Sequence, residues 1–406
     1  MSVQTIDLPG QARANLKAAS AVSTRALSRL TYLDTLRAVM CVLVILVHTA
    51  VTYGSLGDWT FIDHLAKDEM TSILLTFFVI LSQSFFMGLF FFISGYFIPG
   101  SIDRKGMAHF WKDRLLRLGL PFLAYTFLLS KLPIYLAHLR GGNMHRSFPE
   151  FILQRFWQSA DAGPTWFLFA LLVFSAGYTL WRLASSRTAK PGAGQAALPV
   201  PGKWALLGFA GAIAAGMFAV SQVSPLPQAY RLFGSITLML SFFPQYILMF
   251  AAGILAYRGN WLANLPAKSL KFWAVLSACT AAVLPLIFVL GGAMTGKMDA
   301  FWTGLHWQSA AVNLWIALAC VSFSMTLILW LRGRSQSQSP LMGAASASTF
   351  ATYLIHPLVL VPITYALSFW AFHPLAKFAL AGALAIAGSF AVGIALRRIP
   401  GVKAVL

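Results

Sequence analysis

Arg37 and His48 lie inside the first long apolar run of the chain, LDTLRAVMCVLVILVHTAVTY. A helix surrounded by lipid rarely carries either side chain, because an ionised residue at mid-bilayer costs about 2.5–3.5 kcal/mol on insertion scales. At about 100° per residue, Arg37 and His48 fall within about 20° of one helix face. They are roughly 16 Å apart along the axis. We therefore expect one polar stripe that faces protein or a water-filled cavity.

Asp34 precedes Arg37 by three residues, a spacing that predicts an ion pair at the start of this helix. His48 lies further along, in the other half of the membrane. Its imidazole can accept a proton near neutral pH, so it is suited to deprotonate a hydroxyl that attacks an acyl carbon. A packed, hydrogen-bonded histidine is the alternative for His48, and the aligned Arg37 and Asp34 favour a site.

Two further segments could contact an acyl donor. Arg114 and Arg117 share a helix face in WKDRLLRLGLP, where they could hold phosphates; simple anchoring at the membrane surface is the alternative. Ser94 and Gly95 interrupt the aromatic run MGLFFFISGYF. Small residues at that depth usually permit close helix packing, and the same close approach could make room for a slender ligand.

A late segment, STFATYLIHP, places Tyr353 and His356 about one turn apart, with Pro357 next. A proline inside an apolar span loosens the backbone hydrogen bonding, and such positions often line cavities. Structural packing is the alternative for His356.

The composition requires that these residues be held by membrane helices. The chain has 406 residues, of which 58% are hydrophobic and only 10% are charged, and its mean hydropathy is +0.73. Too few polar side chains remain to cover a soluble fold. We predict an all-α polytopic membrane protein with about ten transmembrane helices. Their apolar stretches begin near Asp34, Thr71, Leu115, Pro164, Trp204, Gly234, Leu270, Ser309, Thr349 and Leu375.

The net charge of +19 reflects topology rather than a nucleic-acid partner. If ten helices alternate in direction, most of the 30 Lys and Arg residues fall on the side of the N-terminus. This asymmetry follows the positive-inside rule and predicts that both termini are cytoplasmic. Cys41, Cys279 and Cys320 all lie in predicted spans without paired spacing, so we expect neither disulfides nor a metal.

Three regions are expected along the chain. Residues 1–30 form a polar cytoplasmic tail, residues 31–396 form the transmembrane domain, and residues 397–406 form a second cytoplasmic tail. Within the domain, about residues 185–203 are rich in Gly, Pro, Ala and Ser, which is typical of a flexible cytoplasmic linker.

An ordered set of segments resembles the acyltransferase 3 family of integral membrane acyltransferases. The segments are LDTLRAVMCVLVILVH, FFFISGYF, RLLRLGLP, GPTWFLFALL, FPQYILMFAAGILAY and TFATYLIHP, and they extend over about residues 30–395. The variant resembles the glucans biosynthesis protein C branch. The resemblance implies a multi-pass protein of the bacterial cytoplasmic (inner) membrane.

The family resemblance also implies an activity. An acyl group, acetyl or succinyl, would pass from cytoplasmic acyl-CoA, a co-substrate rather than a bound cofactor, to a hydroxyl of an extracytoplasmic glycan or lipid-linked saccharide. Arg37 and His48 would be the Arg and His of the family's first-helix motif, and Arg114 and Arg117 its paired arginines. Trp166, in GPTWFLFALL, joins Tyr353 and His356 as a candidate on the acceptor side.

The chain departs from the family in one respect. Many members carry an acidic residue shortly before the Tyr-Leu-x-His segment, whereas this chain has no carboxylate from Ser346 onward. Asp34 is the nearest acidic substitute. A secondary transporter of a sugar-linked or anionic substrate is the alternative function, although no repeat-related halves are evident. A non-catalytic sensor or scaffold would need none of the aligned polar groups.

Overall fold

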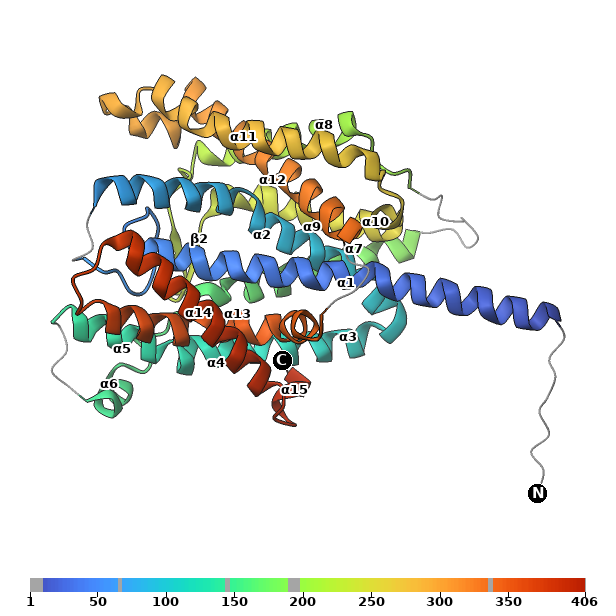
Figure 1. Ribbon diagram of the computed structural model, residues 1–406, viewed down its shortest axis with the longest axis horizontal. Helices are drawn as coiled ribbons and strands as arrows, with labels where there is room; N and C mark the ends of the chain where they lie inside the picture. The colour runs from blue at the N-terminus through green and yellow to red at the C-terminus, as the bar shows by residue number, and fades with distance from the viewer. Residues whose placement is uncertain (1–9, 65–67, 143–146, 189–197, 335–338, 406) are drawn as a thin grey trace.

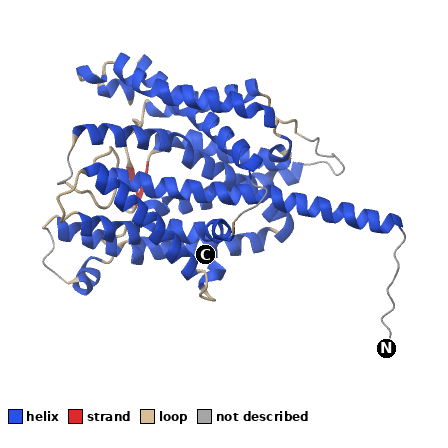
Figure 2. Ribbon diagram, in the orientation of Figure 1, coloured by secondary structure: helices blue, strands red, loops and turns tan. Residues whose placement is uncertain are grey.

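Helices make up almost all of the regular structure in the computed structural model (Figures 1 and 2), which describes residues 10–64, 68–142, 147–188, 198–334 and 339–405. Residues 1–9 of the predicted tail and 189–197 of the predicted linker lie outside the described residues. Ten helical segments of the described chain are long and apolar enough to cross a membrane. The predicted all-α polytopic fold is therefore confirmed.

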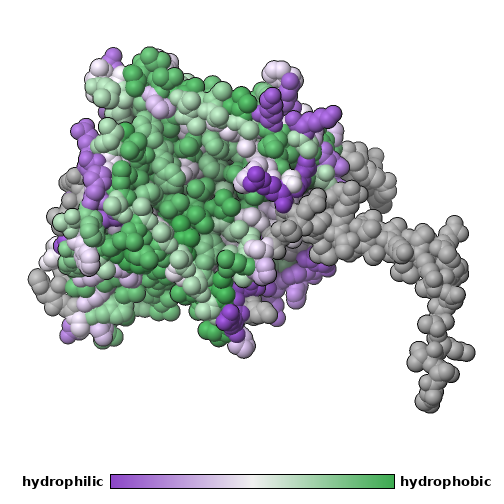
Figure 3. All heavy atoms as spheres, in the orientation of Figure 1, coloured by the Kyte–Doolittle hydropathy of each residue, from purple (hydrophilic) through white to green (hydrophobic). Residues whose placement is uncertain are grey.

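The ten spans have the following bounds: Thr31–Thr52, Glu69–Lys105, Met107–Arg140, Gly163–Ser185, Lys203–Ser221, Leu240–Arg258, Ala267–Thr295, Trp307–Arg334, Pro340–Leu367 and Pro374–Leu396. On the face shown in Figure 3, apolar side chains fill a broad middle band, and hydrophilic ones gather at both ends of the helices. This is the surface expected of a protein whose middle band faces lipid.

The helices that form these spans are α1 (Gly10–Thr52), α2 (Glu69–Lys105), α3 (Met107–Arg114), α4 (Leu120–Ala124), α5 (Lys131–Arg140), α7 (Trp166–Thr188), α8 (Lys203–Ser221), α9 (Phe243–Arg258), α11 (Leu270–Leu290), α12 (Trp307–Arg334), α13 (Pro340–Leu367) and α14 (Pro374–Leu396). Shorter helices are α6 (Phe148–Arg155), α10 (Trp261–Asn264) and α15 (Val402–Val405). The 3₁₀ turns are η3 (Gly163–Thr165), η4 (Leu240–Phe242), η5 (Ala267–Ser269), η6 (Ala293–Thr295) and η7 (Met298–Phe301). We call the two ends of the bundle the α3 end and the α6 end, after the helices that lie there (Figure 1).

The third span is broken twice by π-helical turns, η1 (Leu115–Gly119) and η2 (Tyr125–Leu129). A π turn inserts one extra residue into a helix and so changes the direction in which later side chains point; such turns occur frequently at functional sites. Arg117 lies in η1, whereas Arg114 is the last residue of α3. Arg114 therefore projects from an α-helix, and Arg117 projects from a π-helical turn.

Gly95 lies where α2 crosses α9 with almost no space between the backbones. A Cβ atom built on Gly95 would lie 2.1 Å from the carbonyl oxygen of Phe250, and one built on Gly253 would lie 2.1 Å from that of Phe92. Only glycine fits at both positions. Close helix packing, the alternative raised for Ser94 and Gly95, thus describes what Gly95 does in the structure.

A short hairpin interrupts the stretch in which the sixth span was expected to begin. Strands β1 (Tyr230–Leu232) and β2 (Ile236–Leu238) pair antiparallel. The chain reverses at Phe233 and Gly234, both of which have positive φ. The expected start near Gly234 is therefore wrong by six residues, because an apolar sequence with a turn glycine satisfies its backbone here as a hairpin.

The loop between α1 and α2 folds back over the end of α1 and is fixed there by a buried ion pair. The Lys377 Nζ atom of α14 lies 2.7 Å from Asp63 Oδ2, and both side chains are almost fully buried. The Asp63 amide also donates to the Thr52 carbonyl. This anchoring positions the preceding residues of the loop, which carry Trp59, against the bundle.

Candidate active site

A cavity of about 240 Å³ opens at the α6 end of the bundle. Its walls come from the end of α1, the α1–α2 loop, α2, the loop before α7, the β hairpin and α9. The lining residues are His48, Asp58, Trp59, Thr60, Gln83, Asp161, Gly163, Pro164, Trp166, Arg231, Thr237, Met239 and Tyr246. Of the predicted acceptor-side residues, Trp166 is therefore placed in the same cavity as His48.

His48 is bonded edge to edge to His356, across the contact between α1 and α13. The His48 Nδ1 and His356 Nε2 atoms are 3.0 Å apart. The two rings are inclined by only 9°, and their centroids are 5.1 Å apart. His356 is fully buried, whereas His48 remains partly exposed at the cavity wall. The structure thus brings together two candidate residues that are far apart in the sequence.

The partners of His356 fix the tautomers of this neutral pair. His356 Nδ1 lies 2.5 Å from the carbonyl oxygen of Tyr353. A carbonyl oxygen only accepts, so Nδ1 carries the hydrogen and His356 Nε2 has the lone pair. His48 Nδ1–H then donates to His356 Nε2, which leaves His48 Nε2 as an unprotonated nitrogen. This arrangement is the one a general base requires.

Trp59 covers one face of the His48 ring. The ring centroids are 3.9 Å apart and the planes are inclined by 16°. Trp59 is itself about nine-tenths buried, so the indole shields the imidazole from the loop side. Stacking and the bond to His356 together leave His48 little rotational freedom.

Tyr353 ties the late helix to the turn that begins α7. Its hydroxyl donates to the Pro164 carbonyl, while its own carbonyl accepts from His356. Pro164 lines the cavity, and Trp166 is two residues further along. Tyr353 therefore supports both the dyad and the cavity wall.

The charged groups of the cavity are two carboxylates and one guanidinium. Asp161 lies close enough to Asp58 and Arg231 for their charges to influence it, and its Oδ1 accepts from the Gly163 amide. Burial is the largest influence and raises the pKa of Asp161 above its ordinary value. The carboxylates of Asp58 and Asp161 are thus held close together, and the positive charges of Arg231 and Lys131 act on Asp161.

A second cavity, of about 390 Å³, lies at the α3 end. Its lining residues are Phe97, Ser101, Arg104, Lys105, Phe110, Asp113, Arg114, Arg117, Leu118, Phe350 and Val405. The guanidinium of Arg114 lies over the Phe110 ring, 5.1 Å from its centroid. Arg114 and Arg117 therefore converge on one space instead of pointing separately toward the surface.

Arg37 lies beside this second cavity, behind its lining residue Phe97, and not beside His48. Arg37 Nη1 lies 2.9 Å from Asp34 Oδ1, which confirms the predicted ion pair. Its guanidinium lies 4.6 Å from the centroid of Phe97, which lines the cavity, and its charge is close enough to that of Arg114 to interact. Arg37 and His48 of α1 therefore lie near two different cavities, at opposite ends of the bundle.

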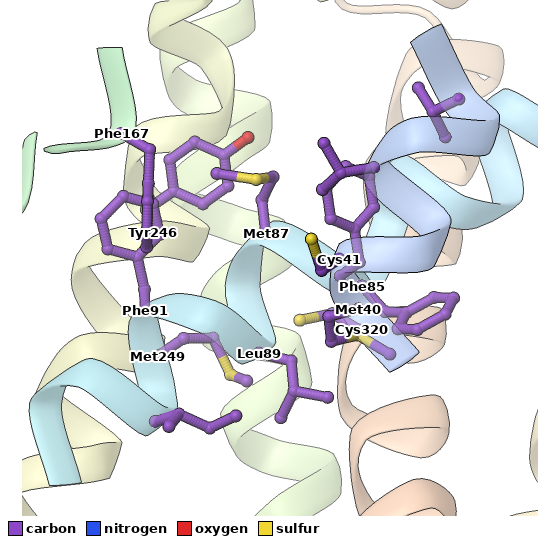
Figure 4. Packing of buried hydrophobic residues seen from close by; sticks show 14 of the residues in the cluster. Met40, Cys41, Phe85, Met87, Leu89, Phe91, Phe167, Tyr246, Met249 and Cys320 are labelled. Atoms are coloured by element: carbon purple, nitrogen blue, oxygen red, sulfur yellow. The ribbon is translucent and has the colours of Figure 1, made fainter. Parts of the chain in front are cut away.

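The two cavities share no lining residue. Met40 and Cys41 of α1 are fully buried between Arg37 and His48. Figure 4 shows the sulfur-bearing side chains in this region: Met40, Cys41, Met87, Met249 and Cys320. Neither Ser94 nor Gly95 lines either cavity. The structure does not bring those two together with the paired arginines.

A family model described as an acyltransferase domain matches residues 30–394, nearly all of the membrane-spanning part. The chain belongs to the acyltransferase 3 family. It is therefore a multi-pass integral membrane acyltransferase that acts on groups other than amino-acyl groups. Neither a curated protein nor a solved structure matches the chain.

Several residues around the His48 cavity carry signals in the sequence that the sequence analysis did not use. Asp161 lies just before the GPTWFLFALL segment, and Trp59 lies in an acidic loop. Gln83 is a polar residue in an apolar helix, which is itself a signal of a site. Arg231 could be placed only once the hairpin was known. Within the described ranges, no three His, Cys, Asp or Glu side chains are grouped to hold a metal ion.

Asp161→Asn should leave this acyltransferase as stable as the wild type at pH 7.5, or make it more stable. The substitution keeps an oxygen for the Gly163 amide and removes a charge that burial disfavours. The pKa of Asp161 is raised in the folded state, so the ionised carboxylate lowers the stability of the wild type at pH values above that pKa. This effect fades as the pH falls and the carboxylate becomes protonated. The difference in unfolding temperature between variant and wild type should therefore shrink toward pH 4.

Thermal unfolding of detergent-purified protein across this pH range would measure the effect. Asp299→Asn, at an exposed position, is the matched control for loss of one negative charge. A variant that is less stable than the wild type by a constant amount at every pH would contradict the prediction.

Proposed function

We propose that the enzyme transfers an acetyl or succinyl group from cytoplasmic acyl-CoA to a hydroxyl of an extracytoplasmic glycan or lipid-linked saccharide. The observation that carries the proposal is the His48–His356 bond, because it leaves an unprotonated imidazole nitrogen beside an open polar cavity. The positive-inside distribution of Lys and Arg supports a cytoplasmic α3 end and an extracytoplasmic α6 end. A bacterial cytoplasmic membrane and the glucans biosynthesis protein C branch fit the same arrangement.

In the proposed reaction, His48 Nε2 takes the proton of the acceptor hydroxyl as its oxygen attacks the thioester carbonyl carbon. The tetrahedral intermediate then collapses, and the carbon–sulfur bond breaks. The CoA thiolate leaves with the proton that His48 returns, so the products are an ester and free CoA thiol. Transfer through an acyl-histidine intermediate is a variant that uses the same nitrogen.

His356 is the positioning residue in this proposal. In general, a base acts efficiently when a second group holds its tautomer and orientation. His356 supplies this function from the late helix, where many family members have a carboxylate nearby. Asp34, the acidic substitute considered from the sequence, is bonded to Arg37 at the α3 end and would act by holding that arginine.

The α3 cavity is the proposed dock for the phosphates of CoA. Arginine binds phosphate through a planar, permanently charged fork, and Arg104, Arg114 and Arg117 all line this cavity. The Phe97 and Phe110 rings hold the guanidinium groups of Arg37 and Arg114 beside this cavity through cation–π contacts. The positive charge gathered here therefore suits the phosphates of a nucleotide.

The acyl-bearing arm of CoA must then pass between Arg37 and His48. Methionine side chains are flexible and adapt their shape more readily than branched ones. Met40 lies between Arg37 and His48 on α1, and Met87 lies one turn along α2 from Gln83, which lines the first cavity. We propose that their rotation opens the passage when the donor binds.

Replacing His48 with Ala should lower glycan acylation at least about a hundredfold, because a general base contributes typically 10²–10⁴-fold. The variant would be expressed in a strain that lacks the native gene, and the glycan would be analysed by mass spectrometry. His306→Ala, at an exposed position on the same end of the bundle, is the control. Full acylation by the His48 variant, at normal membrane levels, would remove the catalytic assignment.

Replacing His356 with Leu should lower kcat about tenfold to a hundredfold and leave the KM for acyl-CoA unchanged, since a misplaced base loses rate rather than donor binding. His356→Gln should restore part of that rate, because its amide can still accept from His48 Nδ1–H. The measurement is initial-rate kinetics in nanodiscs across pH 5.5–8.5. Equal rates for the Leu and Gln variants would show that His356 only fills space.

Arg114→Gln and Arg117→Gln should each raise the KM for acyl-CoA about tenfold, the effect of losing one charge-assisted hydrogen bond. Acyl-pantetheine lacks the nucleotide phosphates, so its KM should hardly change. Arg334→Gln, at an exposed position at the same end, is the matched control. If both donors lost affinity equally, the paired arginines would not be the phosphate dock.

A further inference from the structure

Two buried polar atoms beside the His48 cavity have no hydrogen-bond partner. They are Trp59 Nε1, on the α1–α2 loop, and Gln83 Oε1, on α2. Both side chains line the cavity. A buried donor or acceptor that is left unpaired costs free energy, so native structures pair nearly all such atoms with protein, water or ligand. Two unpaired polar atoms at the wall of one cavity point to a ligand that forms the missing hydrogen bonds.

The two atoms are complementary in kind. Indole Nε1 only donates, and an amide oxygen only accepts. A hydroxyl group does both, so adjacent hydroxyls on one ligand could satisfy Trp59 and Gln83 together. Carbohydrate rings present hydroxyls in this way, whereas a lipid chain or a simple carboxylate does not.

The charges around the cavity favour an uncharged ligand. Asp58 and Asp161 contribute two carboxylates; Arg231 lies on the described wall, and the charge of Lys131 also acts on Asp161. These two positive charges match the two carboxylates, so a sugar with a carboxylate or phosphate near the reacting hydroxyl would add an unmatched negative charge. A carboxylate can also accept a hydrogen bond from a hydroxyl of a neutral sugar, and no like-charge repulsion opposes that contact.

We propose that Trp59 and Gln83 bind the acceptor and that the acceptor unit in this cavity is a neutral sugar ring. The inference rests on the proposed function and narrows its substrate class. Because Trp59 is stacked on His48, a hydroxyl that it binds lies beside the base. The hydroxyl that is acylated is then a neighbour of the one that Trp59 holds. A cavity of about 240 Å³ is the size for one ring rather than for a whole oligosaccharide.

The first test separates acceptor binding from catalysis. Trp59→Phe keeps an aromatic ring against His48 and removes the donor, and Gln83→Met keeps the length and removes the acceptor. Trp157→Phe and Gln228→Met, at exposed positions on the same end, are matched controls. Each protein would be purified into nanodiscs and assayed with acetyl-CoA or succinyl-CoA. The acceptor would be unacylated glycan extracted from a strain that lacks the gene.

Each cavity variant should raise the KM for glycan about tenfold, and the double variant about a hundredfold, with the KM for acyl-CoA unchanged within about twofold. The controls should match the wild type. An unchanged glycan KM in both cavity variants would overturn the inference and leave the proposed function intact. If the wild type transferred neither acyl group to glycan, the proposed function itself would fail.

The second test uses only the wild type, so it does not depend on the folding of any variant. The unacylated glycan would be separated by anion exchange into neutral and acidic fractions, and each fraction would be offered as acceptor. The neutral fraction should be used with a kcat/KM at least tenfold higher. Preference for the acidic fraction would overturn the assignment of a neutral ring.

Discussion

The hydrogen bond between His48 and His356 is the interaction on which the site depends. It joins the end of the first span to the middle of the ninth, and it forms only if α1 and α13 pack side by side. The Tyr353 carbonyl then determines which nitrogen of each ring carries hydrogen. One backbone oxygen inside a helix thus sets the protonation pattern at the cavity wall. The packing of α1 against α13 therefore also determines which ring nitrogens of the two histidines carry hydrogen.

The membrane imposes the second constraint, because it keeps the two proposed substrates on opposite sides. The paired arginines and Arg37 lie at the α3 end, and His48 lies at the α6 end. In the proposed mechanism, a charged nucleotide would stop at the arginines, and only its slender acyl arm would continue. Met40 and Cys41, which lie between Arg37 and His48 on α1, are fully buried in the structure. A passage that opens only for the donor would prevent leakage of ions and hydrolysis of the thioester.

The sequence was sufficient for what depends on local periodicity and composition. It predicted ten membrane helices and the Asp34–Arg37 pair, because these follow from composition and from spacing along one helix. The single polar stripe expected from Arg37 to His48 is instead divided by the fully buried Met40 and Cys41. It could not show that His48 meets His356, since that bond depends on how two distant helices pack. It also could not place Asp161 and Arg231 beside His48, because loops and a hairpin bring them there. The break at Gly234 was missed because an apolar stretch does not distinguish a helix from a short hairpin, here one in which only the second strand is largely buried.

The choice of histidine rather than a carboxylate as the partner of His48 has a physical cost and a benefit. A carboxylate at the fully buried position of His356 would have to be desolvated, whereas a neutral imidazole avoids most of that penalty. The cost is a weaker stabilisation of the imidazolium that would form when His48 takes a proton. The exposed Asp58 on the cavity wall could supply the missing negative charge from the side that water can reach. In this arrangement, the buried His356 would orient the His48 ring, and a carboxylate on the cavity wall would stabilise the imidazolium. A single buried carboxylate beside His48 would have to perform both tasks.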